Sequence, residues 1–531
     1  MKYLNKFLIL ALVCVGFSCT DLNESLNSDF TNNFSPNNPG YGESENVNQP
    51  VPSDGMNSAF SQLLGGTAAH EGYFSVSEIP TDQVVITQKG GDWFDGGIWL
   101  NMHRHDFFPT NPGLNNAWAA NYGGVSQINQ LLANGGLDAN QVAQLRTLRA
   151  YFYWRLSDMF GRIKIITQPG VDSPQVDRPE VFNFIVSEIE AALPDLNESA
   201  GYARISSGAA NALLARLYLN GEVYTRPYPY TPGTGTTYWQ EAIDAADEVI
   251  NSGLYELETN PGDPQVAFDN AFGPANVGSS EHIFVIPYDE ATGQGMQFAQ
   301  MTLHYPSQLT YDLAEQPWNG YSSLEAFYDS FSEDDARKEA FFVAGPQTDR
   351  EGNPILDVAF NPENEAETGD TESGAAINYT PVINELEPNG ARQAGARLGK
   401  FSFKIGQQAH MDNDYPLLRY GDVLLMKAEA VARQSNNWSN GTTLLLVNDI
   451  RERAGLDDVG SLTADEFFAE RGKEMFMESI RRTDMIRFQK WGDAWWEKPA
   501  HSTAYRNIMP IPDPQILATT EGEPLTQHPD Y

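Results

Sequence analysis

The stretch SSGAANALLARLYLNG, Ser206 to Gly221, decides the fold class of this 531-residue chain. It is predicted to form a helix, because Ser206 or Ser207 can cap its start and Gly221 can end it. A second helix is predicted at YWQEAIDAADEVINSG, residues 238–253. Small side chains let helix backbones approach closely, so the two segments predict helix pairs of the tetratricopeptide kind, although the repeat consensus is degraded. The small residues are Ala209, Ala212, Ala215, Ala242, Ala245 and Ala246.

Other segments show the helical pattern on both sides of a less regular middle region. Apolar residues recur at steps of three and four from Val142 to Met159, and Gly161 follows as a C-cap. Between residues 260 and 410 this pattern is lost, and strand-like EHIFVIPY and hairpin-like TDREGNP lie among loops. The sequence therefore predicts a mostly α-helical protein with minor β hairpins. Further helices are predicted over residues 178–196, 416–433, 442–456 and 465–491.

The predicted helix over 465–491 carries acidic residues at a spacing of four, which would repel one another without cations nearby. Helical carboxylate metal sites use Glu-x-x-His pairs, and this segment has no histidine. We therefore expect a charge-paired network that orients the helices, and neither a metal site nor a catalytic one. The row is Glu466, Glu470, Glu474, Glu478 and Arg482, and the neutralising cations are expected to be Arg451, Arg453, Arg471 and Arg481.

The composition is that of a globular protein with a strong negative charge. The chain is 41% hydrophobic and 11% aromatic, and its formal net charge is -38. Phosphate binding needs clustered cations, so a nucleic-acid partner is disfavoured. The same charge repels anionic polysaccharides and favours neutral ligands.

The N-terminus predicts export from the cytoplasm. A basic start precedes an apolar run from Phe7 to Phe17, which is too short to span a bilayer and is typical of a secretory signal. Ser18 followed by Cys19 resembles the lipobox of bacterial lipoproteins, although Gly16 stands where leucine is preferred. That resemblance implies acylation, for example with palmitate, at Cys19, and attached acyl chains would hold the protein on a membrane.

Three N-terminal boundaries follow from this pattern. Residues 1–18 are expected to be a lipoprotein signal peptide, and residues 19–55, rich in Asn, Ser, Pro and Gly, a lipid-anchored tether. An ordinary secreted protein with a free thiol at Cys19 is the alternative. After residue 55 no run approaches the length of a membrane-spanning helix, so the remainder is expected to fold outside the bilayer.

An ordered set of segments resembles the SusD/RagB family of outer-membrane lipoproteins. In the C-terminal half these are NDYPLLRYGDVLLMKAEA, VNDIRERAGL, AERGKEMFMESIRRTDMIRFQKW, IMPIPDPQI and QHPDY. In the N-terminal half they are AWAANYGGVSQINQLL, LRAYFYWRLSDMFG and AANALLARLYLNGEVY. No single segment is specific, but their order, together with the lipoprotein signal, identifies the chain as a member of that family.

The resemblance implies an architecture and a function. A SusD-like domain is expected over 56–531, with a helical-repeat scaffold at about 110–260 and 411–495 and a loop-rich, glycan-facing region at about 75–108 and 260–410. Members of the family are lipid-anchored in the outer membrane, exposed at the cell surface, and hand captured oligosaccharides to a SusC-like TonB-dependent barrel. They do not hydrolyse the glycan and need no cofactor. A neutral glucan of the starch or laminarin type is the favoured ligand.

The stretch GGDWFDGGIWLNMHRHDFF, Gly90 to Phe108, permits either a metal site or an aromatic binding surface. His103 and His105 could bind one metal ion if further ligands converged, but the other histidines are scattered singly. Sugars instead expose C–H faces that stack on indoles, so Trp93 and Trp99 favour a glycan site with rings kept uncovered by glycines. The alternative is that both rings fill a loop core. The polar groups expected to bind sugar hydroxyls are Asp82, Lys89, Asp92, Asp95 and Asn101.

A second candidate lies in AEQPWNGYSSLEAFYDSF. Trp318 precedes Asn319 and Gly320, a turn signal that would hold the indole at a loop tip. The segment resembles the one that faces the glycan in SusD-like proteins, so Trp318 is the foremost predicted contact, with Asn319 beside it. Tyr288 and Tyr321 are secondary candidates.

A peptide-binding adaptor and a glycosidase are the alternatives from other classes of function. A tetratricopeptide adaptor would bind peptides in its concave groove, and the tryptophans would then be buried or scattered. A glycosidase needs two carboxylates about 5–9.5 Å apart, which Asp92 and Asp95 could provide, but nothing in the sequence supplies the raised pKa of a general acid. There is also no G-x-S-x-G motif. We therefore expect a binding protein and no enzyme.

Overall fold

The computed structural model describes residues 51–293, 295–359, 372–519 and 522–531. The predicted signal peptide, Cys19 and the tether up to residue 50 lie outside the described residues. Within the described ranges, every helix is too short or too polar to cross a bilayer.

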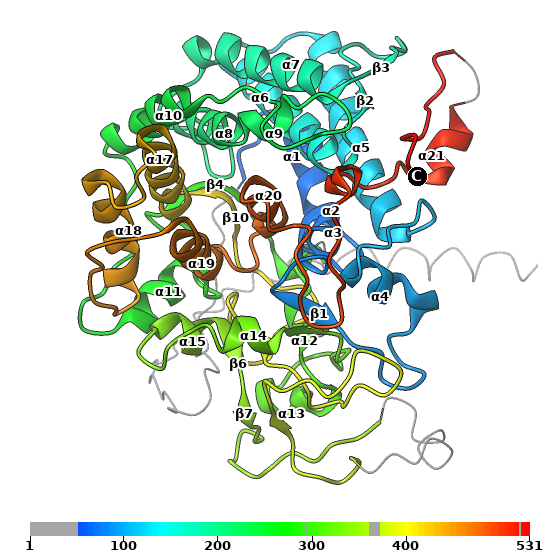
Figure 1. The fold of residues 1–531 in the computed structure, drawn as a ribbon, viewed down its shortest axis with the longest axis vertical. Helices are drawn as coiled ribbons and strands as arrows, with labels where there is room; N and C mark the ends of the chain where they lie inside the picture. The colour runs from blue at the N-terminus through cyan, green and yellow to red at the C-terminus, as the bar shows by residue number, and fades with distance from the viewer. Residues whose placement is uncertain (1–50, 294, 360–371, 520–521) are drawn as a thin grey trace, which may run out of the picture. The chain divides into compact units, whose positions relative to one another are not determined.

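Consecutive helices pack on one another to form the scaffold (Figure 1). α6 packs against α5 and α7, and α10 packs against α8 and α17. All six alanines of α8 and α10 named above are buried, so the predicted close packing of these two helices is confirmed. The structure is mostly α-helical with a tetratricopeptide-like scaffold, as expected. The scaffold helices are α5 (Pro112–Asn134), α6 (Ala139–Phe160), α7 (Arg178–Ala192), α8 (Ser207–Leu219), α9 (Gly221–Tyr224), α10 (Trp239–Asn251), α17 (Tyr420–Ser435) and α18 (Gly441–Arg453).

The predicted capping signals set the helix boundaries. The Ser206 side chain accepts a hydrogen bond from the backbone N–H of Ala209 at 3.1 Å and starts α8. Gly161, with φ of 69°, closes α6 in the left-handed region where glycine carries no steric penalty. At the other end of α6, Asp138 and Gln141 form a reciprocal capping box.

The segments before α5 and between α10 and α17 contain short helices and most of the short strands, and β2 and β3 lie between α6 and α7. The strands pair antiparallel as two-stranded ribbons: β1 with β5, β2 with β3, β4 with β10, β6 with β9 and β7 with β8. The strands are β1 (Val84–Ile86), β2 (Ile163–Lys164), β3 (Gln175–Val176), β4 (His282–Ile286), β5 (Tyr321–Ser323), β6 (Phe342–Val343), β7 (Gly345–Pro346), β8 (Asn378–Tyr379), β9 (Arg397–Leu398) and β10 (Tyr415–Arg419). The short helices include α1 (Asn57–Phe60), α2 (Leu64–Thr67), α3 (Tyr73–Glu78), α4 (Ile98–His103), α11 (Pro264–Phe272), α12 (Phe298–Thr302), α13 (Gln308–Tyr311), α14 (Glu325–Tyr328), α15 (Ala336–Phe341) and, near the C-terminus, α21 (Asp513–Ala518).

Two predicted helices differ from the structure. The helix expected from Pro416 begins only at Tyr420, because the preceding residues form β10, buried against β4 with Tyr415 opposite Ile286. The helix expected over 465–491 is broken into α19 (Ala464–Glu474) and α20 (Arg481–Arg487). In both places tertiary contacts override the local helical pattern.

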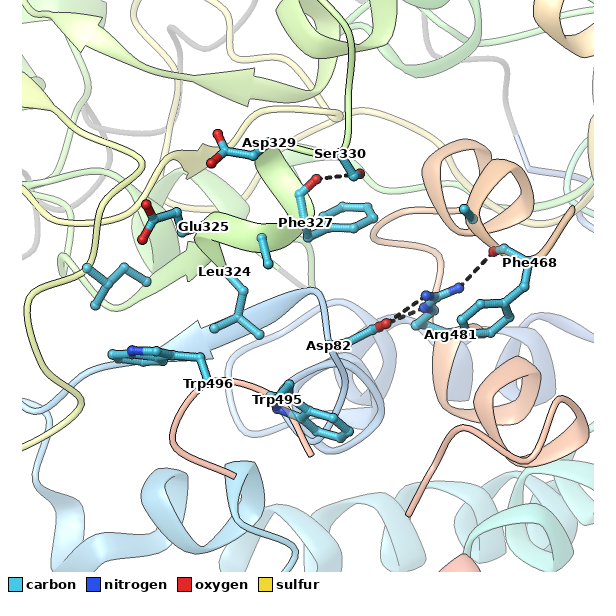
Figure 2. A pocket seen from close by; sticks show the side chains of 13 residues that line it. Asp82, Leu324, Glu325, Phe327, Asp329, Ser330, Phe468, Arg481, Trp495 and Trp496 are labelled. Carbon is cyan, nitrogen blue, oxygen red and sulfur yellow. Dashed lines mark hydrogen bonds and ion pairs between the residues drawn. The ribbon is translucent and has the colours of Figure 1, made fainter. Parts of the chain in front are cut away.

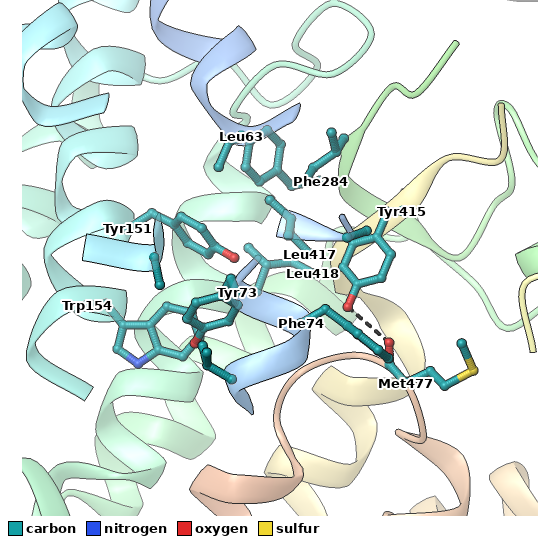
Figure 3. Packing of buried hydrophobic residues seen from close by; sticks show 14 of the residues in the cluster. Leu63, Tyr73, Phe74, Tyr151, Trp154, Phe284, Tyr415, Leu417, Leu418 and Met477 are labelled. Carbon is teal, nitrogen blue, oxygen red and sulfur yellow. Dashed lines mark hydrogen bonds between the residues drawn. The ribbon is translucent and has the colours of Figure 1, made fainter. Parts of the chain in front are cut away.

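The hydrophobic core joins segments that are far apart in the sequence. Figure 3 shows Tyr73 and Phe74 of α3 packed among side chains from α6 and the β4–β10 ribbon. Met477, which follows α19, reaches the same cluster, and its backbone carbonyl accepts a hydrogen bond from the Tyr415 hydroxyl at 3.0 Å. The loop-rich region is thus fastened to the scaffold by one continuous core.

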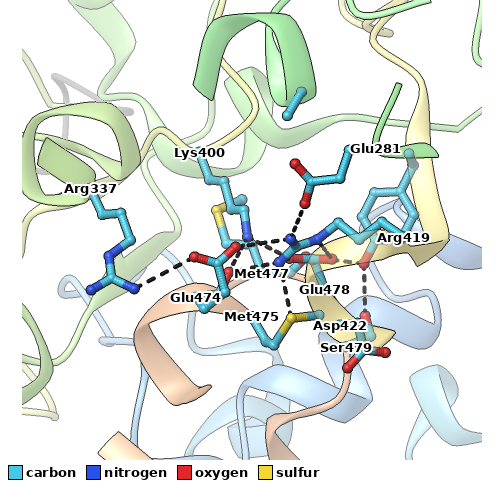
Figure 4. A network of polar contacts seen from close by, with 12 residues as sticks. Glu281, Arg337, Lys400, Arg419, Asp422, Glu474, Met475, Met477, Glu478 and Ser479 are labelled. Atoms are coloured by element: carbon cyan, nitrogen blue, oxygen red, sulfur yellow. Dashed lines mark hydrogen bonds and ion pairs between the residues drawn. The ribbon is translucent and has the colours of Figure 1, made fainter. Parts of the chain in front are cut away.

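A buried network of charges surrounds α19, as the sequence predicts (Figure 4). Arg419 lies at its centre, 2.6 Å from Glu281, 2.9 Å from Glu474 and 2.7 Å from Glu478. Arg451 pairs with Glu470 at 2.9 Å, as expected. The predicted row is nevertheless incomplete, because Glu478 lies beyond the end of α19 in a turn and reaches Arg419 from there. Among the other predicted cations, Arg453 pairs with Glu474, whereas Arg471 binds Asp422 and Asp484 and Arg481 binds Asp82.

Candidate functional site

The antiparallel ribbon of β1 and β5 organises the candidate site. Val84 lies opposite Ser323, and Ile86 lies opposite Tyr321. The chain leaving β1 runs on to the loop of Trp93, while the chain entering β5 comes from Trp318. The sequence-predicted residues around Trp93 and those around Trp318 are therefore brought together at one end of this ribbon.

Five rings gather at that end, and we call them the His70 cluster: His70, Trp93, Trp99, Trp318 and Tyr321. The His70 ring lies at the centre, with centroids 5.3 Å from Trp93, 5.2 Å from Trp99, 5.6 Å from Trp318 and 6.0 Å from Tyr321. Its Nδ1 atom is 3.0 Å from the Tyr321 hydroxyl, which in turn is 2.7 Å from the Ser75 hydroxyl. The predicted tryptophans thus share one site, and a lone histidine that the sequence analysis did not select joins them.

The expectation that the Trp93 and Trp99 rings stay uncovered is wrong. Trp93 is 8% exposed and Trp99 is 1% exposed. The indole N–H of Trp99 donates to Asp95 at 2.7 Å, and that of Trp93 donates to the backbone carbonyl of Trp318 at 2.6 Å. Both rings fill the core of the loop, as the alternative interpretation held. The cause is tertiary: Trp93 packs against Trp318 and Gly320, and Trp99 packs against His70 and Tyr321.

Trp318 is half-buried, as is His70, whereas Trp93, Trp99 and Tyr321 are buried. Asn319 takes a positive φ of 58°, but the predicted turn is wrong: residues 318–320 run along the 300–303 segment, and their backbone N–H groups donate to the carbonyls of Gln300, Leu303 and Met301. Glycine is required next, because a Cβ on Gly320 would lie 2.3 Å from the Trp93 ring. The Trp318 ring lies against the His70 ring, with 5.6 Å between their centroids. It therefore does not project freely from a loop tip. Phe94, 47% exposed, adds an open ring beside Trp93.

The predicted polar partners Lys89 and Asp92 are engaged by the protein itself. Lys89 is buried and its Nζ donates to the Thr87 carbonyl at 3.1 Å. Burial lowers the pKa of Lys89, and Arg397 acts in the same direction. Asp92 accepts hydrogen bonds from the Trp93 backbone at 3.1 Å and from the Tyr305 hydroxyl, and burial raises its pKa. The sequence showed no source for that raised pKa, because burial is a property of the fold.

The remaining predicted residues divide between the core and the site margin. Asn319 is fully buried, and neither polar atom of its side chain has a partner within the described residues, so the expected open position beside a glycan is wrong. Tyr288 is also buried, and its hydroxyl donates to the Leu64 carbonyl at 2.9 Å. Asn101 lies half-buried on α4, and Asp95 is exposed.

The His70 cluster is electrically neutral near pH 7. Burial lowers the pKa of His70 to about 4, so the imidazole carries no charge. A neutral ring cluster suits an uncharged ligand, because such a ligand need not displace an ion pair on approach.

The side chains of His103 and His105 do not point to a common metal position. His103 ends helix α4 and His105 follows with φ of 60°, so the segment is not extended. The Nε2 atom of His103 is 2.8 Å from the Trp496 carbonyl, and that of His105 is 2.7 Å from the Pro80 carbonyl. Across the described ranges, no group of three or more His, Cys, Asp and Glu side chains converges on a metal position.

Asp82 lies outside the His70 cluster, contrary to the expectation that it joins the indoles. It precedes β1 and forms an ion pair with Arg481 at 2.7 Å, at the edge of a separate pocket (Figure 2). That pocket also contains Trp495 and Trp496, which the sequence analysis did not select. The tryptophan doublet, in a segment with glycine and proline nearby, was the available sequence signal.

Comparisons with known proteins agree with this architecture. Residues 280–522 match the SusD family. The starch-binding protein SusD of Bacteroides thetaiotaomicron is 24% identical over 499 residues, covering 86% of both chains. A solved surface glycan-binding protein A from Bacteroides thetaiotaomicron, in complex with laminarihexaose, covers 89% of this chain and 97% of its own at a TM-score of 0.66 and 21% identity. A SusD superfamily protein from Parabacteroides distasonis covers 90% and 98% at a TM-score of 0.69 and 21% identity.

These matches define the fold of the protein. Residues 280–522 carry the SusD family match, and the fold is that of the SusD-like structures. The relative SusD is a starch-binding protein, and the solved surface glycan-binding protein A was determined with laminarihexaose.

Proposed function

We propose that this protein captures a neutral glucan, of the starch or laminarin type, at the His70 cluster. The observation that carries the proposal is the Trp318 indole, half-exposed and laid on a neutral group of rings in a SusD-type fold. A pyranose ring can stack on such a face while its hydroxyls bind polar groups at the margin. Asp95, which is exposed and accepts a hydrogen bond from the Trp99 indole, is the margin group from the predicted set.

The roles of the other predicted contacts are more indirect in this proposal. Trp93 holds the backbone of Trp318 through its indole N–H, and Trp99 packs against His70, on which the Trp318 ring lies. Lys89 and Asp92 fix the loop that carries Trp93, and Asn319 supplies the positive φ after Trp318.

The cellular role proposed with this site follows the family. Residues 1–18 would direct export, acylated Cys19 and the tether to residue 55 would anchor the domain 56–531 at the outer-membrane surface, and a SusC-like TonB-dependent barrel would receive the glycan. Replacement of Cys19 by serine should release the protein from membranes into the soluble fraction. Co-purification of the acylated chain with a barrel protein would support the delivery step.

The binding proposal is tested by affinity electrophoresis of the mature chain through gels containing starch, laminarin or an anionic polysaccharide. We expect retardation by a neutral glucan, little retardation by the anionic one, and loss of retardation in Trp318→Ala. Leu445→Ala is the matched control, because Leu445 is 63% exposed on α18 in the scaffold. No retardation by either glucan would overturn the proposal in favour of a peptide-binding adaptor. Release of reducing sugars from the polysaccharide by pure protein would overturn the non-enzymatic role.

A further inference from the structure

A pocket of about 610 Å³ lies at the opposite end of the β1–β5 ribbon from the His70 cluster. Asp82 precedes β1 and Leu324 follows β5, and both line the pocket, together with side chains from α14 and α19 and from the loop that holds Trp495 and Trp496 (Figure 2). This volume is in the range of small-molecule sites in proteins. Nothing in the function proposed above uses it.

The loop carrying Trp495 and Trp496 is held in place before any ligand arrives. Trp495 and Lys498 exchange two backbone hydrogen bonds, at 3.2 and 3.0 Å. Lys498 Nζ donates to the carbonyls of Trp491, at 3.2 Å, and Asp493, at 2.6 Å. The Trp496 carbonyl lies 2.8 Å from His103 Nε2 on α4. Because the loop is fixed, a ligand that stacks there loses little affinity to ordering it.

The two indoles have different surroundings. Lys498 Nζ lies 4.0 Å from the centre of the Trp495 ring, so a cation occupies one face of that indole. Trp496 is half-buried, lines the pocket and has no cation on its ring among the cation–π pairs of the described residues. Its ring packs against the cluster that contains Leu324 and lies edge-to-face with His103, 6.2 Å between centroids. Of the two indoles, Trp496 is the one without a cation on a face and is the candidate for stacking.

Polar groups lie across the pocket from the indoles. Arg481 and Asp82 share two hydrogen bonds of 2.7 Å, so the guanidinium is neutralised within the site. Glu325, half-buried, and Asp329, exposed, present carboxylates from α14 and its C-terminal end (Figure 2). Carboxylates accept hydrogen bonds from hydroxyl groups and repel anionic ligands.

We propose that this pocket is a second saccharide subsite, in which a neutral sugar ring stacks on Trp496 and donates hydroxyl hydrogen bonds to Glu325 or Asp329. The inference rests on the proposed glycan-binding function and extends it. An indole face, paired with acceptors and an internally neutralised guanidinium, matches the apolar face and hydroxyl edge of a pyranose.

The two subsites share structural elements. α4 carries Trp99, which belongs to the His70 cluster, and His103, which holds the Trp496 loop. The chain from Asp82 to Lys89 connects the two ends and spans at most about 25 Å. In the proposal one extended glucan chain engages both subsites, and longer chains then gain affinity through the second contact.

The test compares Trp496→Ala, Trp496→Phe, Trp318→Ala and Leu445→Ala in starch and laminarin gels with the mature chain. We expect Trp496→Ala to weaken retention about threefold to tenfold on the polysaccharide that the unaltered protein binds. Trp496→Phe should keep most of the retention, because a ring remains for stacking. Glu325→Gln should also keep most of the retention, because an amide oxygen still accepts a hydrogen bond from a sugar hydroxyl. A cationic ligand, in contrast, would lose its binding when the charge of Glu325 is removed.

The outcomes separate the two proposals. If Trp318→Ala loses retention and Trp496→Ala behaves like Leu445→Ala, the second subsite is refuted and the glycan-binding function stands. If the unaltered protein is retained by neither polysaccharide, the proposed glucan binding fails, and the subsite fails with it. Retention that weakens in both tryptophan variants, and further in the double variant, supports both.

Discussion

The network around Arg419 and the His70 cluster both bury polar groups, but the first pairs charges and the second keeps its groups neutral. Near α19 the groups are charged and paired: Arg419 contacts three carboxylates, and every partner is almost fully buried. In the His70 cluster the imidazole is neutral, and the indole N–H groups of Trp93 and Trp99 bind nearby acceptors. Paired charges bind elements to each other, whereas neutral rings leave a surface that an uncharged ligand can approach without breaking an ion pair. This contrast predicts different responses to mutation and to pH.

The largest effect is expected for Arg419→Met. Without the Arg419 guanidinium, the buried carboxylates of Glu281, Glu474 and Glu478 lose a shared positive partner. Breaking a buried ion pair in this way typically costs about 3–5 kcal/mol of unfolding free energy. Urea unfolding, or the soluble yield if the variant does not fold, measures it. Lys490→Met is the control, because the Lys490–Asp465 pair is 35% and 76% exposed and is expected to contribute less than about 1 kcal/mol. Similar losses in the two variants would mean that the buried network does not hold the fold together.

Gly320→Ala should have the next largest effect. The new methyl group would meet the Trp93 ring at 2.3 Å, and overpacking of this kind costs about 1–3 kcal/mol. Because the shift displaces Trp318 as well, glucan retention should fall together with stability. Gly460→Ala, where nothing lies within 4 Å of the added Cβ, is the matched control and should change neither. Normal glucan retention in a destabilised Gly320→Ala protein would mean that the His70 cluster is not the glucan-binding site.

The pH dependence of stability should fall into two windows. Burial lowers the pKa of His103 to about 4, below its unfolded value of about 6.5, so the stability present above pH 6.5 is lost as the pH falls toward 4. Burial acts to raise the pKa of Glu429, but Arg487 and Arg433 lower it to about 2, so its contribution is lost only below about pH 4.5. His70, His304 and His501 have pKa values lowered to about 4 as well, so His103→Gln should reduce the dependence between pH 6.5 and 4 without abolishing it, and leave the lower window unchanged. Urea midpoints measured from pH 7.5 to 3 test this, and an unaltered slope would contradict it.

The smallest effect is expected for Phe94→Ala. Phe94 is 47% exposed beside Trp93, so its removal should change stability by less than about 0.5 kcal/mol. If a glucan lies over the His70 cluster, retention should weaken about twofold to fivefold, a loss below about 1 kcal/mol. Wild-type retention in this variant would confine the ligand to Trp318 and the opposite side of the cluster.

The local patterns of the sequence determined the scaffold. The alanine-rich faces of α8 and α10, the Ser206 cap and the Gly161 stop each depend on residues within a few positions, and the structure follows them. The charge network could also be anticipated, because a row of buried carboxylates requires cations wherever the chain supplies them. The segments that resemble the SusD/RagB family led to the correct fold.

Only the tertiary structure decided which rings are covered, where the last long helix breaks and which residues meet. Met477 and Ser479 take positive φ values between α19 and α20, which allows Glu478 to reach Arg419. Contacts with Trp318 bury Trp93, contacts with His70 and Tyr321 bury Trp99, and Asp82 pairs with Arg481 instead of with the indoles. His70, Trp495 and Trp496 acquire their neighbours from segments hundreds of positions away. Helix formation and capping depend on near neighbours along the chain, whereas burial and partnership depend on contacts between distant segments, which local periodicity does not encode.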